Sequence, residues 1–134
     1  MASRRMEPLW LTRVVVDAIH SDQIREHGGL LGLRDENGLE SALTRPRQKW
    51  HYERPTDLAA LAAAYGFGLA RNHPYHDGNK RVALVAMLAF LAINGQDVDV
   101  DETDVLTTIL ALAAGRLAEA ELASWLRSHL VAMK

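Results

Sequence analysis

Nine consecutive residues, 73–81, bring together side chains that could do chemistry on phosphate groups. The segment reads His-Pro-Tyr-His-Asp-Gly-Asn-Lys-Arg, so a base and a carboxylate precede a glycine turn and two cations. An imidazole has an ordinary pKa near working pH and therefore suits general base catalysis, and His73 supplies one here. A carboxylate beside phosphates, here Asp77, commonly holds the divalent metal that neutralises them. The segment therefore predicts a phosphate-handling site.

An apolar stretch directly follows this segment and predicts a helix. Every residue from Val82 to Ile93 is apolar, a run too short to cross a bilayer, which indicates a helix buried on nearly all sides at the centre of the domain. Its N-terminus should fall near Gly78 or Asn79, where backbone N–H groups lack intrahelical partners and the helix dipole presents about half a positive charge. Such a helix end attracts anions, and Lys80 and Arg81 add full charges.

Helices are expected on both sides of the loop. Pro74 disfavours helical geometry at the residue before it, so His73 should lie in a loop after a helix that ends near Asn72. The glycine-rich stretch from Gly28 to Asn37 is expected to be a loop or a short hairpin. Before the loop, we expect a helix from Pro8 to Gly28 and a brief helix from Gly38 to Thr44 that stops before Pro46. The helix that ends near Asn72 should have its N-cap at Thr56. The central helix should end at Asn94-Gly95, followed by a tiny strand from Asp97 to Val100 and by helices over about 102–114 and 118–132.

Two glycines lie inside the helix that should end near Asn72. Gly66 and Gly68 should each cost about 1 kcal/mol relative to alanine. Close packing against a neighbouring helix is the expected compensation.

Length and composition predict a single all-α domain over residues 1–134, a helical bundle around the central helix. A chain of 134 residues with 49% hydrophobic content can bury a real core. The net charge of −2, from 15 basic and 17 acidic residues, favours neither nucleic acid nor anionic membrane as a partner. The absence of cysteine excludes disulfides and thiolate chemistry. Arg4 and Arg5 precede no apolar segment of useful length, so we expect no signal peptide and a cytoplasmic location.

The loop and the central helix resemble the Fic superfamily. The common pattern of that superfamily reads HPF, any residue, D or E, GN, G, R, and a second R three residues later. In its death-on-curing (Doc) branch of toxin proteins, lysine replaces the last glycine and the second arginine is absent. This chain has Lys80 and Leu84 at those positions, which favours the Doc branch. The similarity covers most of Trp10 to Gly95 and includes Gly28-Gly29, residues 32–35, 39–43 and 45–47, and Arg71-Asn72.

The resemblance implies a role for each residue of the motif. His73 matches the general base that takes a proton from a hydroxyl group of a target protein. Asp77 matches the acidic ligand of Mg²⁺ on the phosphates of ATP. Gly78 and Asn79 match the anion-hole turn, and Arg81 matches an arginine that contacts phosphate. ATP and Mg²⁺ are therefore the expected cofactors.

Lys80 determines which group the resemblance implies is transferred. In adenylylating relatives a glycine there leaves room for the β- and γ-phosphates, whereas in the Doc-type toxin the lysine fills that space, ATP binds reversed and the γ-phosphoryl group is transferred. Pro74 and Gly78 instead match the adenylylating branch, so protein adenylylation stays open as the alternative. The resemblance further implies elongation factor Tu as the phosphorylated target, and hence inhibited translation.

The resemblance also implies a partner that controls the toxin. Self-inhibited relatives carry a helix that reads serine or threonine, three residues, glutamate, then glycine or asparagine, and the only loose match here is Ser3 to Glu7, followed by Pro8. We therefore expect a separate antitoxin, as in a type II toxin-antitoxin system, whose partly disordered segment folds over the cleft. Residues 28–37 should form a flap that aligns the target segment by strand pairing.

Two other classes of function are weighed against this interpretation. In a metal-dependent phosphohydrolase of the HD kind, His76 and Asp77 would form the dyad and His51 a further ligand, completed by one of Asp97, Asp99, Asp101 and Asp104. That interpretation leaves residues 78–81 without a role. The third class is a helical binding module without catalytic activity.

Some residues have simpler structural interpretations. Tyr75 is expected to pack beneath the loop as part of the core, and His76 to be exposed. The stretch from Arg45 to Arg54 contains four cations but is expected to be a solvated connection rather than a nucleic-acid contact.

Overall fold

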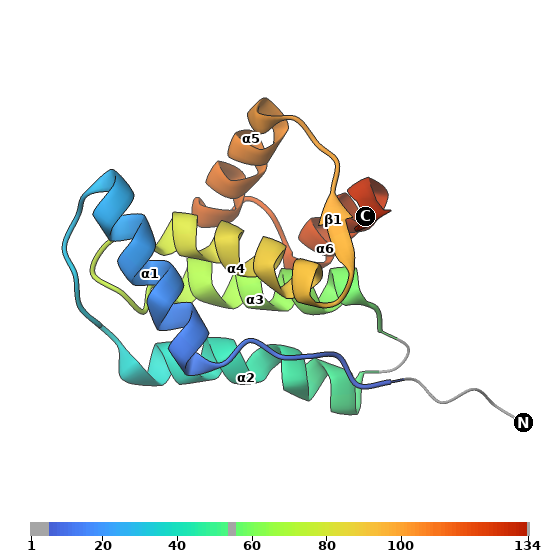
Figure 1. Ribbon diagram of the computed structural model, residues 1–134, viewed down its shortest axis with the longest axis horizontal. Helices are drawn as coiled ribbons and strands as arrows, with labels where there is room; N and C mark the ends of the chain where they lie inside the picture. The colour runs from blue at the N-terminus through green and yellow to red at the C-terminus, as the bar shows by residue number, and fades with distance from the viewer. Residues whose placement is uncertain (1–5, 54–55, 134) are drawn as a thin grey trace, which may run out of the picture.

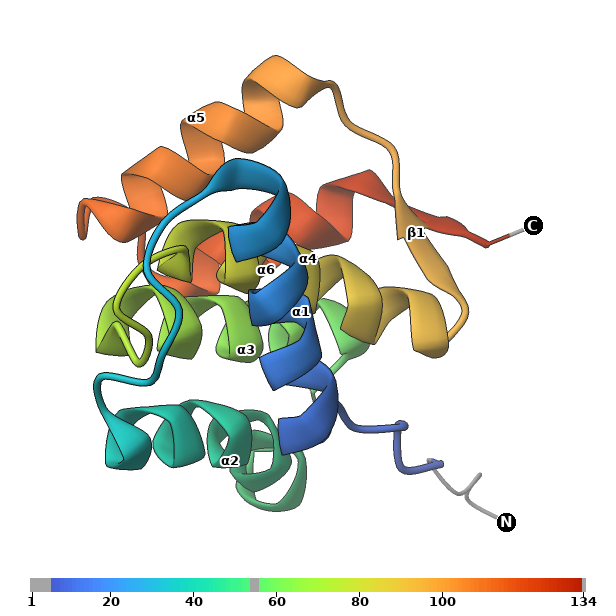
Figure 2. The same cartoon turned by 60° about the vertical axis from the view of Figure 1, so that its left-hand side comes forward.

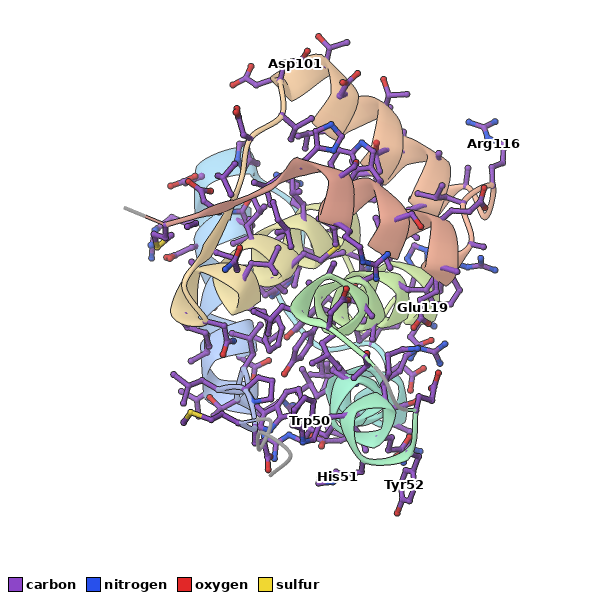
Figure 3. The ribbon with its side chains drawn as sticks, turned by 90° about the vertical axis from the view of Figure 1, so that its right-hand side faces the viewer. Trp50, His51, Tyr52, Asp101, Arg116 and Glu119 are labelled. Atoms are coloured by element: carbon purple, nitrogen blue, oxygen red, sulfur yellow. The ribbon has the colours of Figure 1, made fainter. Side chains whose placement is uncertain are left out.

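The structure is a computed structural model that describes residues 6–53 and 56–133. Six helices make up most of these residues. In chain order the elements are α1 (Arg13–His27), α2 (Glu36–Tyr52), α3 (Leu58–Asn72), α4 (Asn79–Ile93), β1 (Gln96–Val98), α5 (Glu102–Ala113), α6 (Glu119–His129) and β2 (Leu130–Ala132). Figures 1 and 3 show α3 between α2 on one side and α4 with α6 on the other, while α5 lies outermost. This arrangement confirms the expected all-α fold.

The most enclosed helix is α3 rather than α4. The sequence predicts burial on nearly all sides for α4, but Leu88 and Ile93 on its outer face are 38% and 45% exposed. Side-chain size explains the difference, because alanine and glycine let α2, α4 and α6 approach α3 closely. No helix in the two described ranges is both long and apolar enough to cross a membrane. The buried residues of α3 are Ala59, Leu61, Ala62, Ala63, Ala64, Tyr65, Gly66, Gly68, Leu69 and Ala70.

Gly66 and Gly68 allow the close helix packing that the sequence predicts. A Cβ atom added at Gly68 would lie 3.1 Å from the Cα atom of Ala42 in α2. A Cβ atom at Gly66 would overlap the side chain of Met87 in α4. The two glycines therefore face opposite neighbours, and each permits a contact that alanine would obstruct.

Several predicted helix boundaries are confirmed to within a residue or two. α3 ends at Asn72, as Pro74 predicts, although its N-cap is Asp57 rather than Thr56. α4 begins at Asn79 and ends at Ile93. Local signals, chiefly a proline and flanking glycines, set these limits.

The predicted start of α1 at Pro8 is wrong, since the helix begins at Arg13 with Thr12 as its N-cap. The preceding residues are held in non-helical form by the side chain of Asn94 at the far end of α4. Its Oδ1 accepts from the N–H of Leu9 at 2.9 Å, and its Nδ2 donates to the carbonyl oxygen of Leu9 at 3.0 Å. This contact between distant parts of the chain outweighs the local signal of the proline.

The predicted stop before Pro46 is also wrong, because α2 runs from Glu36 through Pro46 to Tyr52. A proline inside a helix costs about 3 kcal/mol through a lost hydrogen bond and a steric clash. The helix continues because its apolar residues fall on one face that packs against α3, so burial offsets this cost. Most of the stretch expected to be a solvated connection, 45–52, therefore belongs to α2, and Arg54 lies outside the described residues. The buried residues of α2 are Leu39, Ala42, Leu43, Pro46 and Trp50.

The end of the chain differs from the predicted long helix. α6 stops at His129, and the next three residues form β2, which pairs antiparallel with β1. Gln96 faces Ala132 in this pairing, and the N–H of Asp99 donates to the carbonyl oxygen of His129 at 2.9 Å. The predicted strand near residues 97–100 exists as β1, and residues 130–132 pair with it instead of continuing α6.

Gly68→Ala should destabilise the protein by about 1–3 kcal/mol, because the backbone of α2 must move to make room. The matched control is Ala120→Gly at an exposed position of α6, which isolates the helix propensity difference of about 1 kcal/mol. Urea unfolding followed by circular dichroism measures both. If Gly68→Ala were as stable as the unmodified protein, α2 and α3 would not be in the close contact described.

Candidate active site

The predicted loop lies between the C-terminal end of α3 and the N-terminal end of α4. His73 caps α3 in the left-handed conformation with φ 47°, which is uncommon for a residue other than glycine. Arg34 supports this conformation from the segment between α1 and α2. Its Nε donates to the carbonyl oxygen of His73 at 2.8 Å, and its Nη2 donates to that of Asn72 at 3.1 Å. No local signal in the sequence points to this role for Arg34.

The buried side chain of Asn79 closes the loop. Its Oδ1 accepts from the N–H of Tyr75 at 3.0 Å, and its Nδ2 donates to the carbonyl oxygen of the same residue at 2.9 Å. The Nδ2 atom also lies 3.3 Å from Nδ1 of His73. Because an amide N–H can only donate, this contact orients a lone pair of the imidazole toward Asn79. Asn79 therefore places the predicted base beside the start of α4.

The N-terminus of α4 is open, as the sequence predicts. Gly78 is the N-cap with φ 81° and provides no side-chain cap. The first intrahelical bond is made by the N–H of Val82, and within residues 6–53 and 56–133 the N–H groups of residues 78–81 have no hydrogen-bond partner. In the same ranges, Lys80 and Arg81 form no ion pair. Cations are disfavoured at a helix N-terminus, so this end is suited to an anion that offsets their charge.

The carboxylate of Asp77 lies beside this helix end. Its Oδ2 accepts from the N–H of Leu30 at 2.7 Å, while Oδ1 has no hydrogen bond to the described residues. No group of three or more acidic, histidine or cysteine side chains in that part of the chain could hold a metal. Mg²⁺ is commonly bound through one or two carboxylates together with substrate phosphates, so one carboxylate with a free oxygen fits that ion.

The metal cluster required by the HD interpretation is not formed by the described residues. His51 lies near the C-terminal end of α2, and Asp101 is the N-cap of α5. Figure 3 shows these two residues at opposite ends of the molecule. His76 is exposed, as expected. Of the other residues that the HD interpretation assigns to the metal, Asp77 alone lies in this loop.

The segment 28–35, called the flap segment below, runs along the loop. It is not the hairpin that the sequence analysis leaves open, because it is one irregular segment joined to the loop by a single bridge between Leu33 and Tyr75. The N–H of His76 donates to the carbonyl oxygen of Gly32 at 3.1 Å, and the N–H of Arg34 donates to that of Pro74 at 2.7 Å. Figure 2 shows the connection from α1 to α2 passing beside the connection from α3 to α4.

Tyr75 packs beneath the loop, as the sequence predicts, and is 3% exposed. Its hydroxyl donates to Oδ1 of Asp17 in α1 at 2.7 Å. Burial, together with this hydrogen bond to a carboxylate, raises the pKa of Tyr75 well above its usual value, so the hydroxyl stays protonated and remains a donor. This role of Asp17 has only one signal in the sequence. Asp17 lies three residues before His20 in α1, so the two side chains share a face of the helix.

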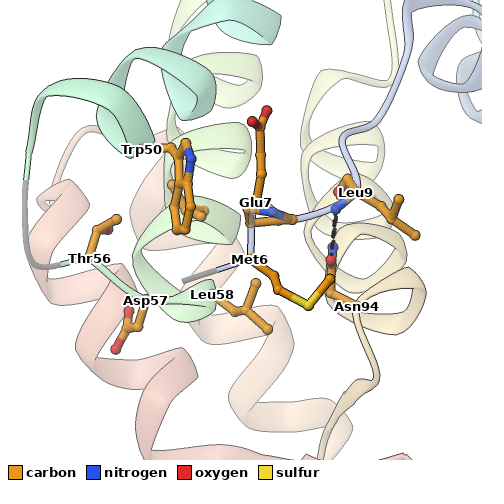
Figure 4. A pocket seen from close by; sticks show the side chains of 10 residues that line it. Met6, Glu7, Leu9, Trp50, Thr56, Asp57, Leu58 and Asn94 are labelled. Carbon is orange, nitrogen blue, oxygen red and sulfur yellow. Dashed lines mark hydrogen bonds between the residues drawn. The ribbon is translucent and has the colours of Figure 1, made fainter. Parts of the chain in front are cut away.

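Two of the larger cavities in the described residues differ in their relation to the loop. An apolar groove of about 580 Å³ between α4 and α5 begins at Lys80 and Arg81 and is lined by Leu84 and Leu88 of α4. A second cavity, of about 690 Å³, lies at the N-terminal end of α3 and contains none of the predicted site residues. Figure 4 shows this second cavity with Trp50 and Leu58 on its wall. The groove is therefore the one that adjoins the candidate active site.

Comparison with known proteins agrees with this geometry. The family model described as Fic/DOC matches residues 10–91, which contain the whole loop, and the chain belongs to that family. It is 34% identical over 110 residues to a protein named Protein kinase doc from Escherichia phage P1, covering 82% of this chain and 86% of that protein. It is 40% identical over 92 residues to a protein named Toxin Doc from Mycolicibacterium smegmatis, covering 63% of this chain and 68% of that protein.

Asn79→Ala should destabilise the protein by about 2 kcal/mol, because it leaves the buried N–H and the buried carbonyl oxygen of Tyr75 without this partner. Asn37→Ala, at an exposed position of α2, is the matched control and should change little. Chemical denaturation of both variants provides the measurement. Equal stability of Asn79→Ala and the control would mean that the amide does not close the loop.

Proposed function

We propose that this protein is a Doc-type toxin that phosphorylates a hydroxyl side chain of a target protein with ATP. The single observation that carries the proposal is the open N-terminus of α4, which lies next to Asp77 and to the imidazole of His73. The names of the two relatives, one a protein kinase and one a toxin, support it. A helical binding module without catalytic activity would need neither the free N–H groups nor the base.

The proposed reaction follows from the positions of these groups. Nδ1 of His73, the ring nitrogen with the lone pair, takes the proton of the target hydroxyl in place of its long contact to Asn79 while the hydroxyl oxygen attacks the γ-phosphorus. The bond from that phosphorus to the bridging oxygen breaks, and ADP leaves with the electron pair. The N–H groups at the start of α4 and the guanidinium of Arg81 stabilise the negative charge on the phosphates. Asp77 would hold Mg²⁺, which supplies further charge neutralisation when it is bound.

The side chain of Lys80 supports transfer of the γ-phosphoryl group. It is exposed in the first turn of α4, the turn that carries the free N–H groups, and it adds bulk and charge to that turn. Leu84, at the position of the second arginine of the family pattern, lines the apolar groove instead of presenting a charge. Adenylylation remains the alternative, because Pro74 and Gly78 match the adenylylating branch.

The target and its alignment are part of the proposal. We propose elongation factor Tu as the phosphorylated protein, which would act in the cytoplasm and whose modification would inhibit translation. The flap segment would align the target by strand pairing. The side chains of Leu30 and Leu31 are 67% and 65% exposed on this segment, so they offer apolar contacts beside the loop.

An antitoxin acting in trans is the proposed regulator. Glu7, the glutamate of the weak self-inhibitory match, accepts a hydrogen bond from Trp10 and lines the cavity at the N-terminal end of α3, away from the loop. Ser3 of that match lies outside the described residues. The groove between α4 and α5, with Leu106 and Leu110 exposed on its α5 side, provides apolar surface next to Lys80 for an antitoxin segment.

Incubation with elongation factor Tu and with ATP labelled at either the α- or the γ-phosphorus tests the reaction. The γ label alone should appear on the target. Lys80→Gly should reduce that label, because the charge and bulk that favour the reversed nucleotide are removed. An α label from the unmodified protein would establish adenylylation, and no label from either nucleotide would reject the proposed target or the proposed activity.

His73→Ala should abolish phosphate transfer while the protein stays folded, because the side chain is exposed and only one long contact to Asn79 is lost. General base catalysis commonly contributes about 100- to 10,000-fold, which sets the expected loss of rate. His76→Ala, at the exposed histidine of the same loop, is the matched control and should retain activity. Full transfer by His73→Ala would remove His73 from the mechanism.

A further inference from the structure

One face of α1 packs against the loop that joins α3 to α4. Asp17, His20 and Ile24 are spaced three and four residues apart, so they lie on the same side of the helix. His20 is 4% exposed and Ile24 is 7% exposed. A buried histidine needs a hydrogen-bond partner, because burying an unpaired polar group is costly. Nothing in the proposed reaction so far uses the imidazole of His20.

The ring of His20 is held in one orientation. Its Nε2 lies 2.9 Å from the carbonyl oxygen of Asp77, and because a carbonyl oxygen can only accept, Nε2 carries the proton and donates. The ring is stacked on that of Tyr75, with centroids 3.8 Å apart and planes 7° from parallel. Tyr75 is fixed in turn by its hydrogen bond to Asp17. The donor therefore reaches one specific atom of the motif.

This hydrogen bond determines the direction of the peptide group between Asp77 and Gly78. A trans peptide is planar, and its carbonyl oxygen and N–H point in opposite directions. Since the carbonyl oxygen of Asp77 points toward His20 in the interior, the N–H of Gly78 points outward, toward the open end of α4. That N–H is among those without a partner in the described residues. The turn also lies against α1, because a Cβ atom at Gly78 would be 3.3 Å from Ile24 and 3.8 Å from the ring of His20.

We propose that His20 is a positioning residue for phosphate binding. Its Nε2–H fixes the peptide between Asp77 and Gly78, which aims the N–H of Gly78 at the phosphate site and holds the backbone that carries the Asp77 carboxylate. His20 touches neither the nucleotide nor the target and acts through Asp77. This inference rests on the proposed function, since it assigns His20 to the same site.

Three variants separate positioning from simple packing. His20→Phe keeps an aromatic ring against Tyr75 and removes the donor, and His20→Leu serves the same purpose if the larger ring does not fit. His20→Gln replaces the ring with an amide whose N–H can reach the same carbonyl oxygen. His51→Gln, at an exposed histidine of α2, is the control. Thermal unfolding first establishes that each variant is folded.

Two measurements then test the proposal. The amide resonances of Gly78 and Asn79, recorded without nucleotide, respond to a change in the direction of the peptide group. The rate of γ-phosphoryl transfer at saturating Mg²⁺-ATP reports the consequence. We expect His20→Phe to move the Gly78 resonance and to lower kcat about 10- to 100-fold, as loss of a supporting hydrogen bond commonly does. His20→Gln should restore both most of the way, and His51→Gln should change neither.

Each result separates this proposal from the proposed function. An unmoved Gly78 resonance in folded His20→Phe overturns the positioning role, as does unchanged kcat in a variant whose resonance has moved. Equal losses in His20→Phe and His20→Gln also overturn it, because packing rather than the donor would then be responsible. If the unmodified protein transferred no label to any protein, the proposed function would fail, and the amide resonances would still decide whether His20 directs the peptide group.

Discussion

The unpaired N-terminus of α4 is the constraint on which the rest of the site depends. Within the described residues, the N–H groups are free and the two cations beside them form no ion pair, an arrangement that an isolated helix would not favour because the helix dipole and the side-chain charges have the same sign. The first turn can remain in this state only where it meets water or an anion and where the preceding loop does not fold over it. Asn79 meets the second requirement by directing its side chain back into the loop, toward Tyr75, instead of capping its own helix.

Three parts of the chain that are far apart in the sequence hold the loop in place, each from a different direction. Arg34 of the flap segment binds the carbonyl oxygen of His73 at its beginning, and His20 of α1 binds that of Asp77 near its end. The packing of α3 supplies the third direction, because its small residues place the end of α3 next to the start of α4. A base, a carboxylate and an open helix end are thus brought together by elements that themselves do no chemistry.

The same geometry connects the chemistry with the expected partners. The flap segment hydrogen-bonds to the loop on one side and exposes Leu30 and Leu31 to solvent. The apolar groove between α4 and α5 begins at Lys80 and Arg81, so a protein bound in the groove would lie beside a phosphate group held at the N-terminus of α4. Under the proposed function, the target would contact the flap segment and the antitoxin would contact the groove.

The sequence alone determined the family, the candidate site residues of the loop as a proposal, and the ends of the helices around it, because those features arise from local chemistry. Pro74 ends α3, Gly78 permits the turn, and the apolar run that follows requires a helix. Only the tertiary structure decided that α2 continues through Pro46, that residues 130–132 form β2 instead of continuing α6, and that α3 rather than α4 is the most enclosed helix. These outcomes depend on burial and pairing between distant residues. The role of His20 belongs to the same group, because its partner lies 57 positions away along the chain.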